Sequence, residues 1–300
     1  MEKKYISDIL NNGQKGHQNL DYLDVDINDD NLMFIDPMLI ECQEDAWFVE
    51  ADKTIRSFFD ELYIAFRNRD NIKKNTLLSH AGEQNGTRLG YGNGYNGKGN
   101  TMQGLLHTFS PLDELLNEIR TIDRAIDLPV LLPGFSEDGL SDMLTNIIHD
   151  NLNEFTMSQL KKCGLEGNYD LSYWTWNRNI RKWEHVTRLS FCVHGKELLL
   201  VPKQIVRRNY LFSTDQYFRR IILERMRNED KYVFNGKPIS KKDVLKMKRF
   251  SGEHWQYDET IAYTRENNDA LDDYHRELPL FYLEEGRIPT DEDLDNCIYS

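Results

Sequence analysis

The sequence predicts an α+β fold, in which a central mixed or antiparallel sheet is flanked by helices and followed by a helical C-terminal part. Two observations predict it. Apolar residues recur at helical spacing in the first half, and a middle segment is rich in aromatic and β-branched residues separated by turn signals. We expect a single domain over 31–283, between an acidic N-terminal arm at 1–30 and an acidic mobile tail at 284–300.

In the N-terminal half, residues 32–40 (LMFIDPMLI) read as a buried strand interrupted at Asp36-Pro37, because proline cannot donate to a sheet ladder. The segment 47–68 has apolar residues at i, i+3 and i+4 and predicts a helix. Further elements expected in this half are a short strand at 77–79 and amphipathic helices at 112–126 and 140–161.

The C-terminal half begins with three expected antiparallel strands, of which the last two form a hairpin around His194-Gly195. Their ranges are 171–176, 186–193 and 197–206. The helices expected after them lie at 214–228, at 240–249 with Ser240 as N-cap, and at 253–276.

The composition fits a globular protein with a real core, since 39% of the residues are hydrophobic and 11% are aromatic. No apolar run approaches the ~18 residues of a membrane span, and the N-terminus lacks an apolar signal segment. We therefore expect a cytoplasmic protein. The four cysteines are scattered without a CxxC pair, which disfavours a zinc site or a disulfide framework.

Charge is distributed unevenly along the chain. The net charge is −13, yet residues 203–249 hold fourteen Lys and Arg against five Asp and Glu. This basic block could neutralise phosphates, with Arg207, Arg208, Arg219 and Arg220 as the expected nucleic-acid contacts. The other interpretations are an ordinary helix surface with i,i+4 ion pairs and a docking face for an acidic partner.

Three acids gather where an apolar run passes into a helix: Glu137, Asp138 and Asp142. Magnesium binds through a few carboxylates and retains several waters, so these residues are candidate Mg²⁺ ligands. The alternative is an amphipathic helix whose acidic first turn is stabilised by the helix dipole and capped by Asp138 or Ser141.

A lysine, Lys203, follows the apolar run ELLLVP at the end of an expected strand. Such a lysine could stabilise negative charge on a phosphate or an attacking hydroxide. The alternative is a lysine that extends from the strand end into solvent.

Residues 83–100 (EQNGTRLGYGNGYNGKGN) form a glycine-rich loop whose free backbone amides could approach an anion. Arg88 and Lys98 would add charge for a phosphate or a nucleic-acid backbone. The loop contains a G-x-G-x-x-G match but no GK[ST], so it is not a Walker A motif. An ordinary surface loop explains it as well.

The segments FIDPMLI, EQNGTRLGYGNGYNGKGN, DGLSDMLTNII and LLLVPKQIV resemble blocks of bacterial proteins found in defence islands and mobile elements. The acid and strand-end lysine are similar to the PD-(D/E)XK nuclease core. That resemblance implies Asp142 as the metal-binding acid and Lys203 as the active-site lysine. The family carries Glu or Asp two residues before the lysine, whereas this chain has Val201. Another acid would have to replace it, from the set Glu137, Asp138, Asp36 and Glu83.

Three functions follow as hypotheses. The first is a Mg²⁺-dependent nuclease that cleaves DNA in bacterial anti-phage defence, with Asp142 and a second acid on the metal and Lys203 stabilising charge. The second is a non-catalytic subunit of a defence complex, which docks a protein partner and positions nucleic acid. The third is a nucleotide sensor that uses the glycine-rich loop.

Overall fold

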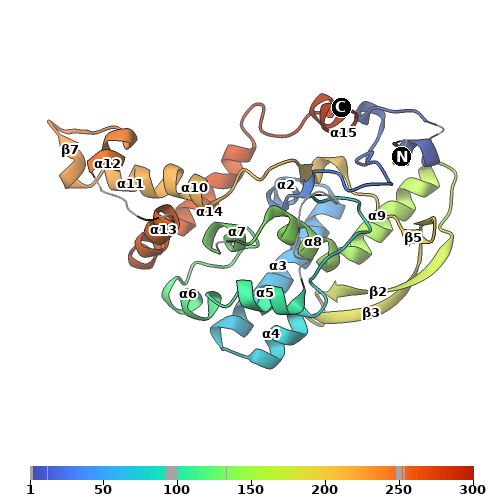
Figure 1. The fold of residues 1–300 in the computed structure, drawn as a ribbon, viewed down its shortest axis with the longest axis horizontal. Helices are drawn as coiled ribbons and strands as arrows, with labels where there is room; N and C mark the ends of the chain where they lie inside the picture. The colour runs from blue at the N-terminus through green and yellow to red at the C-terminus, as the bar shows by residue number, and fades with distance from the viewer. Residues whose placement is uncertain (1–2, 12, 92–100, 133, 248–251, 253) are drawn as a thin grey trace.

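The computed structural model describes residues 3–11, 13–91, 101–132, 134–247, 252 and 254–300. The fold is mixed α/β, with 52% helix and 13% strand, which agrees with the predicted class. Within those ranges the strands pair as four separate two-stranded antiparallel sheets. The expected central sheet is not among them, and helices provide most of the framework (Figure 1).

The longest helix, α3 (Ala46–Arg67), confirms the helix predicted at 47–68. Its apolar stripe is buried, because Phe58, Phe59 and Leu62 are fully covered by neighbouring elements. The next helix is α4 (Asn71–Leu78), so the short strand expected at 77–79 is wrong. An apolar Leu-Leu pair fits either element, and here the side chain of Asp70 caps the helix by accepting from Lys73 N at 3.0 Å.

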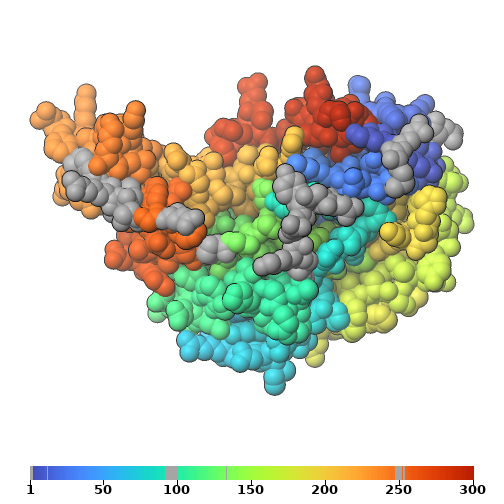
Figure 2. Space-filling view, in the orientation of Figure 1, coloured from blue at the N-terminus to red at the C-terminus, as the bar shows by residue number. Residues whose placement is uncertain are grey.

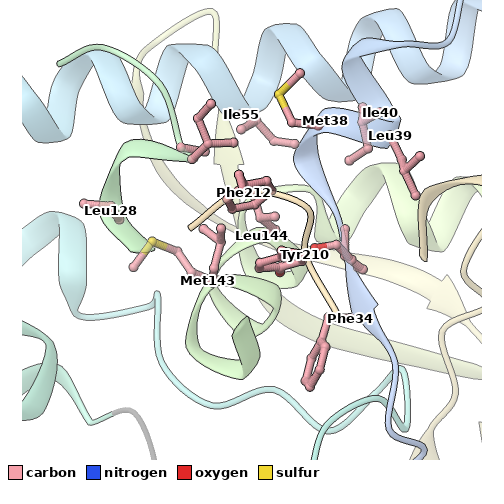
Figure 3. Packing of buried hydrophobic residues seen from close by; sticks show 14 of the residues in the cluster. Phe34, Met38, Leu39, Ile40, Ile55, Leu128, Met143, Leu144, Tyr210 and Phe212 are labelled. Atoms are coloured by element: carbon pink, nitrogen blue, oxygen red, sulfur yellow. The ribbon is translucent and has the colours of Figure 1, made fainter. Parts of the chain in front are cut away.

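The segment 32–40 is a short strand followed by a helix, β1 (Phe34–Ile35) and α2 (Pro37–Glu41). Asp36 is the N-cap of α2 and accepts from Met38 N at 2.9 Å, while Pro37 occupies the first helical position. The Asp-Pro pair therefore begins a helix rather than interrupting a strand. Figure 3 shows Phe34, Met38 and Leu39 of this segment among the buried residues at the centre of the molecule.

Two helices replace the single one expected at 140–161, namely α8 (Glu137–Ile147) and α9 (His149–Lys162), with a break at Ile148. The first of them begins earlier than expected because Ser136 Oγ accepts from Gly139 N at 3.1 Å. Neither Asp138 nor Ser141 is the cap. Ser141 Oγ instead accepts from Ile35 N at 3.0 Å and holds β1 against α8.

Upstream, the predicted helix 112–126 is shorter than expected. The helix α6 (Leu112–Glu118) ends before Ile119, and the chain becomes helical again only at α7 (Asp127–Leu131). A further short helix, α5 (Met102–Thr108), precedes them.

The main sheet is the hairpin of β2 (Tyr169–Asn177) and β3 (Lys182–Ser190), which lies below α3 and α9 in Figure 1. Trp176 and Trp183 lie opposite each other in its register, and both pack edge-on against Phe58 of α3, with ring centroids 5.1 and 5.5 Å away. These contacts attach the hairpin to the helical core.

The predicted strand 197–206 is wrong, although its hairpin with the preceding strand exists in short form. The strands β4 (Cys192–Val193) and β5 (Lys196–Glu197) pair around His194-Gly195. The chain then leaves the ladder, and Leu199 N bonds to Gly86 O at 2.9 Å. It passes through the 3-10 turn η2 (Lys203–Ile205) into β6 (Val206–Arg207), which pairs with β1.

The C-terminal part is helical, as predicted, and extends away from the rest of the molecule (Figures 1 and 2). The helix predicted at 214–228 is confirmed, with one π-helical segment inside it. Ser240 caps the next helix as expected, since its Oγ accepts from Asp243 N at 3.2 Å. The elements of this part are α10 (Thr214–Tyr217), η3 (Phe218–Ile222), α11 (Leu223–Arg227), η4 (Asp230–Tyr232), β7 (Val233–Phe234), β8 (Lys237–Pro238), α12 (Lys241–Met247), α13 (Trp255–Glu266) and α14 (Asp269–Tyr282).

The expected arm and tail are packed against each other in the structure. The arm contains α1 (Ile6–Leu10) and η1 (His17–Asn19), and the tail contains α15 (Asp291–Ile298). His17 Nδ1 lies 2.6 Å from Asp295 Oδ1, and Figure 1 shows α15 beside the N-terminal segment. The structure thus places a docked helix where the sequence predicts a mobile tail. No helix in the described part of the chain is long and apolar enough to cross a membrane.

Candidate functional site

The three predicted metal ligands lie on α8, but the Glu137 carboxylate forms a structural hydrogen bond. Its Oε1 accepts from Tyr210 N at 2.6 Å, and Tyr210 Oη donates back to Glu137 O at 3.1 Å. Burial raises the pKa of Glu137, with the Tyr210 bond and Arg207 opposing the rise. This carboxylate therefore anchors the 210 segment to the start of α8.

Asp138 and Asp142 share one face of α8 with Asn146, one helical turn apart. Asn146 Nδ2 donates to Gly82 O at 2.7 Å, so this face is turned toward the segment 82–91. Asp142 is buried, with 8% of its surface exposed.

Asp138 lies against the start of the glycine-rich loop. An added Cβ at Gly90 would come within 2.8 Å of Asp138 Oδ1, and the φ of Gly90 is +137°. Glycine is therefore required at this position both for the backbone conformation and for the close approach of the carboxylate. The loop residues 92–100 lie outside the described residues, and with them the predicted contact Lys98.

The charges of two carboxylates from other segments, Asp30 and Glu83, act on Asp138. Burial raises its pKa first, and the negative charges of Asp30 and Glu83 raise it further. The pKa of Asp30 is also raised, by burial and then by Asp29, while Arg88 opposes the rise. Glu83 is one of the acids expected to take the place of Val201, whereas no sequence pattern points to Asp30.

Lys203 has partners in the arm and the tail. Its Nζ donates to His17 O at 2.5 Å and lies 2.7 Å from Asp291 Oδ1 of α15. Only 16% of its side chain is exposed. These contacts join three parts of the chain, and none of them involves an acid of α8.

The arginine doublets of the basic block have partners that the sequence did not reveal. Arg207 is buried beside Asp36, with Nη1 3.7 Å from Oδ2. Arg219 Nε lies 2.6 Å from Asp215 Oδ1, and Arg220 lies 3.6 Å from the centroid of the Phe281 ring. Arg208 is exposed and has no ion pair within the described ranges.

A cavity of about 530 Å³ opens beside Asp30, and we name it the Arg88 cavity. Arg88 and Lys196 supply its positive charges, and Asp29, Asp30 and Glu197 supply its negative charges. The other lining residues are Ile27, Asn28, Gln84, Asn85 and Gly86.

Arg88 is held rigidly in the wall of this cavity. Its Nη2 donates to Glu197 O at 3.1 Å and its Nη1 to Asn85 O. Its φ of +59° is unusual for a residue with a side chain. Non-glycine residues in this conformation persist where surrounding contacts compensate the strain, and such positions often lie at binding sites.

A buried histidine supports Glu197 from behind the cavity. Gln84 Oε1 accepts from Gly86 N at 2.7 Å, which directs the Gln84 amide nitrogen to His149 Nδ1, 3.4 Å away. His149 Nδ1 is therefore the acceptor, and Nε2–H donates to Glu197 Oε1 at 3.0 Å.

The histidine ring is also fixed in orientation. It stacks on Tyr173 with ring centroids 3.9 Å apart and planes 3° from parallel. Tyr173 Oη donates to Asp150 Oδ1 at 2.8 Å, and burial raises the pKa of this phenol. A carboxylate held by an oriented imidazole can accept a proton from a bound water or hydroxyl group.

The sequence contains only a partial signal for the His149–Glu197 pair. His149 falls on the same polar stripe as Asp142 and Asn146, one turn further along. Glu197 was assigned to a buried strand, and its proximity to His149 depends on the hairpin between β4 and β5.

In the described part of the chain, one group of three has its ligand atoms within 4.8 Å of one another: Asp123, Asp127 and His275. It includes none of the predicted ligands Glu137, Asp138 and Asp142. Two of its potential ligand atoms are hydrogen-bonded to each other, since His275 Nε2 lies 2.7 Å from Asp127 Oδ1.

Comparison with known proteins gives one match. A family model described as a domain of unknown function (DUF8370) matches residues 12–213. These residues contain the Arg88 cavity and its supporting histidine, and they end before α10. Comparison with curated proteins and with solved structures gives no significant match.

Proposed function

The chain belongs to the DUF8370 family, and from the geometry of its Arg88 cavity we propose that it is a Mg²⁺-dependent nuclease. The observation that carries this proposal is the meeting of three functional groups in one concave site. Acids, cations and a histidine-supported carboxylate all converge there.

The acids supply the donor set that Mg²⁺ prefers. Among the described residues, the ligand atoms of Asp138, Asp30 and Glu83 are not gathered within 4.8 Å of one another, so Mg²⁺ would bind one or two of these carboxylates and keep several waters. Burial and then the charges of Asp30 and Glu83 raise the pKa of Asp138, and a nearby cation would offset the effect of those charges. Asp142, one turn along α8 from Asp138, is the fourth acid on this face. A bound Mg²⁺ would polarise the phosphate and lower the pKa of a water.

The cations supply phosphate binding. Arg88 presents a planar guanidinium that can hold two phosphate oxygens, and Lys196 presents a mobile ammonium group from β5. Both lie in the same wall as Glu197.

Glu197 is the general base in this scheme. Water attacks the phosphorus, Glu197 accepts the water proton, and the P–O bond to the leaving sugar oxygen breaks. His149 holds the carboxylate through Nε2–H and leaves its second oxygen for the water. Lys203 has no part in this step, because it is bonded to His17 and Asp291.

The test is a cleavage assay with Mg²⁺, Mn²⁺ or EDTA on single-stranded DNA, double-stranded DNA and RNA. We expect metal-dependent cleavage that Glu197→Gln and Asp138→Asn each reduce about 100-fold or more. Glu154→Gln on α9 is the matched control, because Glu154 is exposed and does not line the cavity. The proposal fails if the wild type cleaves none of these substrates, or if Glu197→Gln cleaves at the wild-type rate.

A second candidate is a non-catalytic subunit of a bacterial defence complex. It is favoured by the exposure of Leu280 and Leu283, 65% and 58%, on the C-terminal part beyond the family match. This function predicts nucleic-acid binding without cleavage and co-purification with a protein encoded nearby. Loss of that co-purification in Leu280→Ser/Leu283→Ser, with DNA binding retained, would distinguish it from the nuclease.

A further inference from the structure

A second cavity, of about 260 Å³, lies between α3, the chain after α6 and the turn of the β2–β3 hairpin. We propose that it binds the phosphate group of a small phosphate ester, independently of the Arg88 cavity. Three arginines line it, Arg67, Arg120 and Arg181, and we name it the three-arginine cavity. Its remaining lining residues are Asp60, Tyr63, Ile64, Ile122 and Asp123.

Two of its three arginines lack an anionic partner. Arg67 Nε donates to the Leu116 carbonyl at 3.3 Å, and across the described ranges neither Arg67 nor Arg120 forms an ion pair. Like charges in one concavity repel each other, so an anion between them is favoured. Arg181 is the exception, because its Nη1 lies 2.9 Å from Glu61 Oε1.

Two acids also line the cavity, Asp60 and Asp123. Asp123 Oδ1 lies 3.9 Å from Arg124 Nε and 3.6 Å from His275 Nδ1, so Arg124, outside the cavity, shares its charge. Asp60 remains, in the field of Arg181.

The loop after α6 is braced by bonds that do not involve the guanidinium group of Arg120. Asn268 Oδ1 accepts from Arg120 N at 2.7 Å, and its carbonyl accepts from Thr121 Oγ1 at 3.0 Å. Tyr63 Oη donates to Arg124 O at 2.7 Å and fixes the other side of the same loop to α3. The guanidinium groups are thus presented by a braced loop and a long helix.

The size and chemistry of the cavity define the ligand class. Guanidinium groups bind phosphate oxygens in pairs. Tyr63, Ile122 and the partly exposed Ile64 offer an apolar floor beside them. At about 260 Å³ the cavity lies just below the ~300–1,000 Å³ that small-molecule pockets usually span, so it suits a small ligand, a phosphate with a small organic group such as a mononucleotide.

The first test measures the chemical reactivity of individual arginines in the wild-type protein. Phenylglyoxal labelling is quantified by peptide mass spectrometry in chloride, in inorganic phosphate and in a mononucleotide, at equal ionic strength. We expect phosphate or the nucleotide to protect Arg67 and Arg120 about fivefold or more. Arg208, which is exposed and outside the cavity, should label equally in all three conditions. Equal labelling of Arg67 and Arg120 in all conditions overturns the proposal.

The second test separates the two cavities. Calorimetric titration of the mononucleotide without divalent metal should show an affinity that Arg67→Gln/Arg120→Gln weakens at least tenfold. Arg88→Gln should leave that binding event in place. If Arg88→Gln abolishes all binding while the double variant binds like the wild type, the three-arginine cavity is not a phosphate site.

Discussion

At the scale of single residues, Asp36 shows how the fold changes the meaning of an acid. The sequence offers it as a candidate site acid, and the structure buries it completely as the cap of α2. Tyr282 Oη donates to its Oδ2 at 2.8 Å, and Arg207 lies nearby. Burial raises the pKa of Asp36 to about 6, although Arg207 and Tyr282 oppose the rise.

This raised pKa makes a prediction about stability. Because the folded pKa is above the unfolded value of ~3.9, protonation favours the folded state, and that contribution is lost as the pH rises through about 6. Asp36→Asn keeps the cap without titrating. The unfolding free energy of the wild type relative to Asp36→Asn should fall by roughly 2–3 kcal/mol between pH 4 and pH 7. Denaturant titrations that give parallel pH profiles would contradict this.

Trp183 gives a second prediction at this scale. It is 8% exposed, its Nε1 donates to Leu77 O at 2.8 Å, and it packs on Phe58. Trp183→Ala should lower the unfolding free energy by about 3–5 kcal/mol, measured by urea denaturation. Trp174→Ala on the same hairpin is the matched control, because Trp174 is 40% exposed and should cost about 1 kcal/mol. Equal losses would show that the hairpin does not pack on α3 in this way.

At the scale of elements, α15 is attached to the rest of the chain by polar contacts with the arm. Lys203 joins His17 to Asp291, and Tyr299 Oη donates to Asp24 Oδ2 at 2.6 Å. The buried Leu294 and Ile298 complete the contact. The position of α15 therefore depends on contacts with residues that lie far away in the sequence.

Lys203→Met should loosen α15 while leaving the proposed cleavage reaction unaffected. We expect a loss of about 1–3 kcal/mol in stability and faster amide hydrogen exchange at 291–298. Lys162→Met is the control, since the Lys162–Asp21 pair is exposed and should contribute below ~1 kcal/mol. Unchanged exchange at 291–298 in Lys203→Met would contradict the docking role.

Helical periodicity predicted elements well where one face is buried, as in α3, and it placed Asp142 on a helix. Asp138 was expected only as a cap of the helix at 140–161, whereas it lies inside α8. It could not decide between a helix and a strand at Leu77-Leu78, because two adjacent apolar residues fit either spacing. The alternating run at 171–193 was recognised as antiparallel strands, but the chain after Glu197 is apolar because it is buried and not because it pairs in a sheet. Apolar composition alone does not separate those two causes.

At the scale of the whole molecule, the candidate site combines segments that the sequence keeps far apart. Asp30, Glu83, Asp138, His149 and Glu197 come from five places in the chain, and only the acids of α8 stood out as a cluster. Likewise, Arg225 lies 2.9 Å from Asp269 and also pairs with Asp273, so α14 neutralises this arginine of the basic block. Local sequence cannot reveal partners that tertiary packing brings together.

Charge pairing across the molecule predicts a shallow salt dependence for nucleic-acid binding. Each neutralised phosphate contributes a slope of about −0.9 in log–log plots, so binding of two to four phosphates at the Arg88 cavity gives a total of roughly −2 to −4. Fluorescence anisotropy on duplex DNA should show that Arg219→Gln/Arg220→Gln leaves the slope unchanged, whereas Arg88→Gln/Lys196→Gln reduces it by about 2. A steep wild-type slope that the first pair abolishes would instead make the basic block the nucleic-acid surface.

The most direct test of the proposed site compares two variants in one cleavage assay. The rate of cleavage of a fluorescent DNA strand in Mg²⁺ is measured for the wild type, Glu197→Gln and Lys203→Met. We predict that Glu197→Gln loses about 100-fold or more, while Lys203→Met stays within about threefold of the wild type. Loss of cleavage in Lys203→Met with full activity in Glu197→Gln would contradict this site.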